Sequence, residues 1–240
     1  MTMLNVVAEE LGFGRERRRE RLMSTHIPYL RHVADTVIGL ESGAILSVIK
    51  LDGLFFQTED QAELNMRAAV QNTLIRALGS SRYSLWSTVI RKEVKPSIGG
   101  AFSDPFCDLL NGRYMASLRD KRMFTNELYL TIVRSGMRGA LGAAEGFSRL
   151  LDRSSGKEVL EQRLHERINE LEEILGNVTR ELQKYGARPL GVFYRDGEPY
   201  SEPCAFINTL LTCGVARDMR LPRMGIRSYV GTSRLHFSKR

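Results

Sequence analysis

Cysteine and histidine are the residue types in this sequence that most often do chemistry, but they are not spaced for it. Cys107, Cys204 and Cys213 include no CxxC pair, so they build neither a zinc motif nor a redox motif. The four histidines lie far apart and form no HExxH motif, which argues against a transition-metal site. Carboxylate pairs such as Glu172-Glu173 fall on a predicted solvent face. We identify no catalytic residue and no metal ligand in the sequence.

A phosphate-binding loop is also missing from the sequence. A P-loop has the pattern G-x-x-x-x-G-K-S/T, in which backbone amides cradle the phosphates. The only Gly-Lys pair is Gly156-Lys157, with Leu151 where the first glycine belongs and Glu158 after the lysine. We therefore expect that this chain by itself holds no cofactor and neither binds nor hydrolyses ATP.

Charge gives a clearer indication of a partner. The chain of 240 residues has a formal net charge of +7. Its last 28 residues hold seven basic residues against Asp218 alone, so nearly all of the excess lies there. The segment is interpreted either as a surface for nucleic acid or an acidic protein, or as a link to a following acidic domain. The candidate contacts for an anionic partner are Arg217, Arg220, Arg223 and Arg227.

A second basic segment lies near the N-terminus, where residues 15–22 read RERRRERL. A solvated helical turn or a disordered tail is the slightly favoured interpretation, because Glu16 and Glu20 dilute the positive field. The alternative is an anchor on anionic lipid or on an acidic membrane partner. The candidate contacts for that anchor are Arg15, Arg17, Arg18, Arg19 and Arg21.

Composition restricts the class of protein. Hydrophobic residues make up 42% and charged residues 26%, which allows a packed core and is unlike a disordered chain. The longest clean apolar runs, such as 44–49, are far shorter than the ~20 residues of a membrane span. The N-terminus lacks the layout of a signal peptide. Three scattered cysteines indicate a reducing compartment, and we expect a cytoplasmic protein.

Hydrophobic periodicity predicts an α+β fold, with a mixed or antiparallel sheet and packed helices. The sheet signal starts with a hairpin at 36–40 and 44–51. Trp86 is expected to be a core anchor, and Met66 to lie on the buried face of the first helix. The other predicted elements are helices 58–78, 105–119 and 202–215, strands 83–94, 124–133 and 190–194, and a closing pair of strands at 226–230 and 234–237.

A regular apolar stripe predicts one long amphipathic helix at about 157–185, which Gly186 and Pro189 end. Such a helix is nearly 40 Å long at about 1.5 Å per residue, and would overhang strands of ordinary length. The stripe packs either on its own sheet, in a coiled-coil hairpin or on another subunit. The candidate subunit or domain contacts are Leu175, Val178 and Leu182.

Four segments follow from these patterns: a basic N-terminal segment at 1–24, a first α+β subdomain at 25–134, a Gly-rich linker at 135–156, and the long helix with a second α/β part at 157–240.

Several short stretches occur in an order that carries a resemblance. They are HIPY at 26–29, LDG at 51–53, ELN at 63–65, LW at 85–86, FTNELYLTIV at 124–133, RPLG at 188–191 and SRLHF at 233–237. In this order they resemble the N-terminal domain of the VirB-four/TrbE/CagE ATPases of bacterial type IV secretion and plasmid conjugation. The resemblance runs over most of the chain, although no single stretch is specific.

The resemblance implies an α+β domain in front of a RecA-like motor, which carries the Walker motifs and uses ATP and magnesium. It implies inner-membrane subunits of the secretion machine and other copies of the chain, in a hexameric or dimer-based assembly, as partners. It also implies a peripheral location at the cytoplasmic face of the bacterial inner membrane. This chain stops before any Walker motif, so we expect a fragment, a chain seen in part or a degenerate copy. The alternative is a free-standing basic α+β protein that binds nucleic acid.

Overall fold

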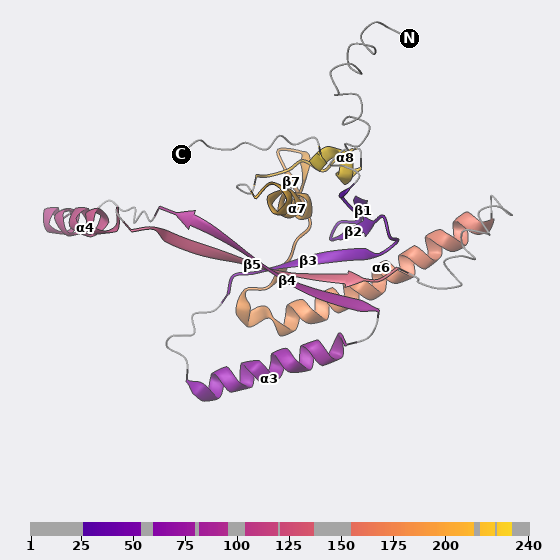
Figure 1. The fold of residues 1–240 in the computed structure, drawn as a ribbon, viewed down its shortest axis with the longest axis horizontal. Coiled ribbons are helices and arrows are strands. Elements are labelled where there is room, and N and C mark those ends of the chain that lie inside the picture. Colours follow the sequence, from indigo (N-terminus) through magenta and orange to yellow (C-terminus); the bar gives the residue numbers. More distant parts are fainter. Residues whose placement is uncertain are drawn as a thin grey trace, which may run out of the picture. The chain divides into compact units, whose positions relative to one another are not determined.

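A computed structural model describes residues 26–53, 60–79, 82–95, 104–119, 121–136, 155–213, 217–223 and 225–231. These residues form antiparallel strands and several helices, which confirms the predicted α+β class (Figure 1).

The strands are β1 (Tyr29–Ala34), β2 (Val37–Leu40), β3 (Ile45–Leu51), β4 (Tyr83–Val94), β5 (Met123–Arg134), β6 (Arg188–Pro189), β7 (Val192–Arg195) and β8 (Glu198–Ser201). The helices are α3 (Gln61–Ala77), α4 (Pro105–Leu118), α6 (Ser155–Glu181), the 3-10 turn η2 (Gln183–Tyr185), α7 (Glu202–Thr212) and α8 (Ile226–Gly231).

The chain forms two compact units, each built from segments that are distant in the sequence. The first unit takes the described residues of 1–47, 133–174 and 190–240. The second unit takes those of 48–132 and 175–189. This division differs from the predicted segments, since the range 25–134 is shared between the units. The predicted segment 1–24 and residues 137–154 of the predicted linker lie outside the described residues.

The first unit is built on the β2–β3 hairpin that the sequence predicts. Strand β2 pairs with β3 and with β1, both antiparallel. The β-branched residues Val37, Ile38 and Ile45 are fully buried and form its core. Helix α6 is fixed to this hairpin by Arg167, whose guanidinium donates to the carbonyl oxygen of Gly43 at 2.8 Å.

The C-terminal part of the first unit contains the β7–β8 hairpin and two short helices. Asp196 and Gly197 both have positive φ, of 53° and 77°, as a two-residue hairpin turn requires. Residues 226–230 form helix α8, so the predicted strand there is wrong. Ile226 and Val230 are both buried, and their spacing of four places them on one face of a helix. The predicted strand 234–237 lies outside the described residues.

The second unit contains β4 and β5, close to their predicted bounds. Strand β5 lies between β3 and β4, which makes β4 the last of the described strands in this order. Trp86 is 65% exposed on β4, so its predicted role as a core anchor is wrong. Met66 on α3 is also exposed, against prediction. Both errors have one cause: the described elements cover these faces only in part.

The end of α6 belongs to the second unit. The α-helix stops at Glu181, four residues before its predicted end, and Gly186 follows the 3-10 turn with a φ of 65°. A Cβ on Gly186 would lie 2.5 Å from Asp52 Oδ2, so a side chain does not fit there. The backbone N–H of Asp52 donates to the carbonyl oxygen of Tyr185 at 3.0 Å. These contacts hold the helix end against β3.

Leu175, Val178 and Leu182 are all buried within this chain. The sequence analysis proposed them as subunit or domain contacts because the helix end was expected to overhang. The structure covers that end with the chain itself, so the overhang is a wrong premise. We do not retain these three residues as candidates for a contact with another subunit.

Candidate docking surface

Helix α4 starts where its sequence directs it to start. The Asp104 carboxylate accepts a hydrogen bond from the backbone N–H of Phe106 at 2.8 Å, and Pro105 occupies the first turn. Such a cap satisfies a donor that the helix itself leaves free, and the fixed φ of proline suits the first helical position. Asp108 adds negative charge to the first turn, which the helix dipole favours. The predicted helix at 105–119 is thus confirmed.

One face of α4 carries four large apolar side chains that the described structure does not cover. Their positions step by three, one and four residues, which places them along a single stripe. Each of them is between 51% and 67% exposed, and none of the described residues of α4 is buried. We call these four residues the α4 stripe: Phe106, Leu109, Leu110 and Tyr114.

The exposed stripe has an energetic consequence. A helix of 14 residues is marginal in water by itself, and most helices in proteins are stabilised by packing of an apolar face. Full burial of a Leu or Phe side chain stabilises by about 1.5–3 kcal/mol. For four side chains that are a little more than half exposed, a partner that covered the stripe would contribute about 3–7 kcal/mol. The described chain does not realise this contribution.

Polar contacts join the ends of β4 and β5 between which α4 lies in the sequence. Figure 1 shows α4 beyond the ends of β4 and β5. Arg122, just before β5, makes two hydrogen bonds to the Glu93 carboxylate near the end of β4, at 3.2 and 2.9 Å. The Arg91 guanidinium lies 4.2 Å from the ring centroid of Phe124, in cation–π geometry. These contacts fix the two strand ends from which α4 extends.

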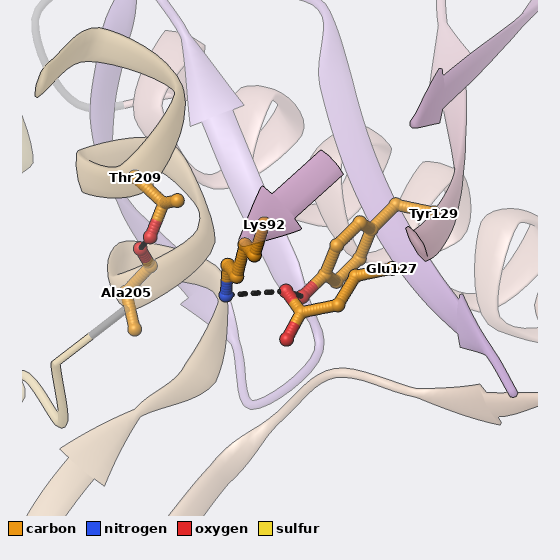
Figure 2. A network of polar contacts seen from close by, with 5 residues as sticks. All are labelled: Lys92, Glu127, Tyr129, Ala205 and Thr209. Carbon is orange, nitrogen blue, oxygen red and sulfur yellow. Dashed lines mark hydrogen bonds and ion pairs between the residues drawn. The ribbon is translucent and has the colours of Figure 1, made fainter. Parts of the chain in front are cut away.

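A second polar cluster links β4 and β5 further along (Figure 2). The Lys92 ammonium donates to Glu127 Oε2 at 2.7 Å, and the Tyr129 hydroxyl donates to the same oxygen at 3.0 Å. Burial alone would raise the pKa of Glu127, but the hydrogen bonds from Lys92 and Tyr129 and the lysine charges outweigh it, and the pKa is lowered. The Lys92 ammonium on β4 and the Tyr129 hydroxyl on β5 both donate to the Glu127 carboxylate, so the cluster holds the two strands together.

The comparison with known families bears on the same region. Residues 36–141 match the model of the type IV secretion system ATPase VirB4/TrbE, N-terminal domain. This part of the chain is similar to VirB4/TrbE N-terminal domains. The match confirms the resemblance drawn from the sequence, and it includes all of α4.

Curated relatives extend the similarity over most of the chain. A type IV secretion system protein virB4 from Brucella suis is 31% identical over 227 residues, which is 92% of this chain and 27% of that protein. PtlC from Bordetella pertussis, also a type IV secretion system protein, is 25% identical over 94% of this chain and 27% of its own length. The chain therefore spans about a quarter of the length of these relatives.

A buried His-Ser-Cys cluster in the first unit has the residue types of a nucleophilic site. His32 Nε2 lies 2.8 Å from Ser201 Oγ and 3.7 Å from Cys204 Sγ. His32 Nδ1 lies 3.2 Å from the carbonyl oxygen of Ala34, so it carries the proton and Nε2 accepts from the serine hydroxyl. Ser201 Oγ in turn accepts from the backbone N–H of Cys204 at 3.0 Å, as the N-cap of α7.

This cluster is structural. Ser201 and Cys204 are fully buried, so a substrate does not reach them. Burial lowers the pKa of His32, and burial raises the pKa of the Cys204 thiol, which keeps both groups neutral. The sequence analysis missed the cap, although Ser201 with Pro203 two residues later is a readable signal for a helix start.

The predicted basic contacts fall in different settings. Arg220 forms an ion pair with Glu198 at 3.6 Å, and Arg227 forms one with Glu41 at 3.4 Å. Arg217 and Arg223 are exposed. Two of the four charges are thus balanced by carboxylates, which weakens the proposed anionic-partner surface. The N-terminal candidates Arg15, Arg17, Arg18, Arg19 and Arg21 lie outside the described residues.

Two further kinds of site were sought in the part of the chain that the structure describes. None of its helices is both long and apolar enough to cross a membrane. Its histidines, cysteines and acidic residues form no group of three or more that could hold a metal ion. The α4 stripe, which the sequence alone does not indicate, is an apolar surface of these residues that a partner could use.

Proposed function

We propose that this chain is the N-terminal assembly and docking domain of a type IV secretion ATPase. In this role it attaches an ATP-hydrolysing motor to inner-membrane components and to neighbouring subunits, for pilus assembly and substrate transfer. The observation that carries the proposal is the α4 stripe, a helix face left uncovered inside the region that matches the VirB4/TrbE N-terminal domain.

Contiguous exposed apolar side chains on a helix are uncommon in proteins that act alone, and they mark interaction sites. The relatives are named as proteins of type IV secretion systems, and we take the partner to be another protein of such a system. The domain would sit at the cytoplasmic face of the inner membrane, held there by protein contacts. ATP and magnesium would belong to the motor and not to residues of this chain.

Replacing Phe106 and Leu110 together with Asp, in cells that contain the rest of the machine, tests the proposal. Two charges on the stripe should prevent docking, so recovery of the protein with the membrane fraction and substrate transfer should both fall about 30-fold or more. The protein should still accumulate, because neither side chain is buried.

Val159→Asp is the matched control, because Val159 is a half-exposed apolar residue on another helix, α6. This variant should behave as the parent does. Membrane recovery and transfer that are unchanged in the Phe106/Leu110 variant would reject docking through α4.

A further inference from the structure

An apolar hollow in the second unit has the size of one large side chain. Its volume is about 180 Å³, and it lies between the end of α3, the start of β4 and Ile132 of β5. Leu78 and Ile132 are buried, while Ile75 and Leu85 remain partly exposed at its edge. An apolar cavity of about 150 Å³ accommodates benzene, so this hollow has room for a phenyl ring.

The α4 stripe offers such a ring. Phe106 is the most exposed of its four residues, at 67%, and stands in the first turn with Leu109 and Leu110 beside it. A protruding aromatic residue that enters an apolar pocket, with aliphatic residues around it, is the usual form of an interface hot spot. The same chain therefore carries a protruding ring and a hollow of matching size. We call the Phe106 side chain the knob and the hollow between α3, β4 and β5 the hole.

The charges around the two features are opposite. Asp104 and Asp108 flank Phe106 in the first turn of α4. Arg76 lies in the last turn of α3, next to Ile75, and exposed Arg82 precedes β4. When the knob enters the hole, acidic side chains meet basic ones, which orients the contact and disfavours other partners.

The hole lies too far along β4 to be filled by the α4 of the same chain. Leu85 at the hole and Val94 at the end of β4 are nine residues apart, or about 30 Å at ~3.3 Å per strand residue. Helix α4 follows β4, and only three residues separate Arg119 at its end from Met123, where β5 starts. The helix is thus held at the strand ends opposite the hole, which leaves the hole to another molecule.

We propose that the α4 stripe of one copy of this chain docks in the hollow between α3 and β4 of a second copy, with Phe106 in the hole. This proposal rests on the proposed function and names one partner for its docking surface. The two surfaces differ, so the contact is head-to-tail and leaves one knob and one hole unused in each pair. Repetition of such a contact gives a ring or an open chain of copies.

Mixing two complementary variants tests this arrangement. Phe106→Asp removes the knob, and Ile75→Asp places a negative charge at the hole, where it repels Asp104 and Asp108. Each variant of the full chain should associate about 30-fold more weakly than the parent in sedimentation velocity. An equal mixture should form dimers and nothing larger, because each pair then has one intact knob and one intact hole.

The control is again Val159→Asp, which should associate as the parent does. A parent that stays monomeric at high concentration would overturn the proposal. So would a mixture that forms no dimers, or an Ile75→Asp variant that associates as well as the parent. If Ile75→Asp keeps normal membrane recovery and transfer in cells while the Phe106/Leu110 variant loses both, α4 docks on a different protein. That result would overturn this inference and leave the proposed function standing.

Discussion

Removing the cap of α4 should make this helix open more often without unfolding the rest of the domain. In the structure, the backbone N–H of Phe106 donates to the Asp104 carboxylate at 2.8 Å, and Asp104→Ala removes this acceptor. Loss of an N-cap costs about 1 kcal/mol, with a range of about 0.5–2 kcal/mol. For a helix in equilibrium with its unfolded form, 1 kcal/mol lowers the equilibrium constant about five-fold.

The magnitude matters here because α4 has little stability in reserve. None of its described residues is buried, so packing contributes little to hold the 14 residues in place. The five-fold change should appear directly in local opening, while the midpoint of global urea unfolding stays where it is. A helix packed on its own domain would behave in the opposite way, with the loss transmitted to global stability.

Hydrogen exchange of the backbone amides of 107–118 is the assay, read beside a urea melt of the same sample. In Asp104→Ala the exchange of these amides should speed up about five-fold at an unchanged melt. Asp104→Asn is the matched control, because asparagine caps a helix about as well as aspartate. Unchanged exchange, or a urea midpoint that falls by the full cost of the cap, would refute the description of α4 as an unsupported helix.

Three other predictions concern the rest of the chain. Ser201→Ala should lower the free energy of unfolding by about 2–4 kcal/mol in urea melts, because it removes the α7 cap and leaves His32 Nε2 without its hydroxyl partner. The control is Ser228→Ala, at an exposed site on α8. A loss in Ser201→Ala that is no larger than the loss in the control would contradict the structural role of the cluster. The pKa of Glu127 is lowered in the fold, so its stabilisation is complete above its unfolded pKa of about 4.3 and is lost as the pH falls through the folded pKa. Glu127→Gln should therefore cost about 1 kcal/mol at pH 7 and progressively less as the pH falls below about 4, and a cost that does not change with pH would be the contrary result. Finally, any DNA affinity should be weak and little changed by replacing Arg220 and Arg227 with Gln, since carboxylates already pair with both; tight binding that falls steeply with salt would favour a nucleic-acid protein instead.

Local signals in the sequence are sufficient to predict much of this fold. The Gly43 turn between two β-branched runs predicts the β2–β3 hairpin, and the predicted helix 105–119 agrees with α4 to within one residue. The short strands β1, β6 and β8 are not found: β6 pairs with β3, far away in the sequence, and β1 and β8 are too short to show a period of their own, although each pairs with the next or the preceding strand. Helix α8 is mistaken for a strand, since six residues hold too little of either period to decide between them.

Exposure is the property that the sequence does not determine. Leu175 and Val178 on α6, with Leu182 just after it, and the α4 stripe all follow a helical period, yet the first set is buried and the second is exposed. Trp86 shows the same difficulty on a strand. Apolar residues are spaced along a helix in the same way whether their own chain or a partner covers them. The docking surface is therefore visible only in the packing of the two helices.

The native cysteines allow the central claim, that a partner covers α4 in the assembled machine, to be measured without mutation. Cys107 is exposed on α4 beside Phe106, Cys213 is exposed after α7, and Cys204 is buried. Alkylation of Cys107 and Cys213 by a maleimide should be fast in the isolated chain. In membranes that hold the full set of secretion subunits, the rate at Cys107 should fall several-fold while that at Cys213 stays the same. Equal rates at Cys107 in the isolated and assembled states would contradict the claim.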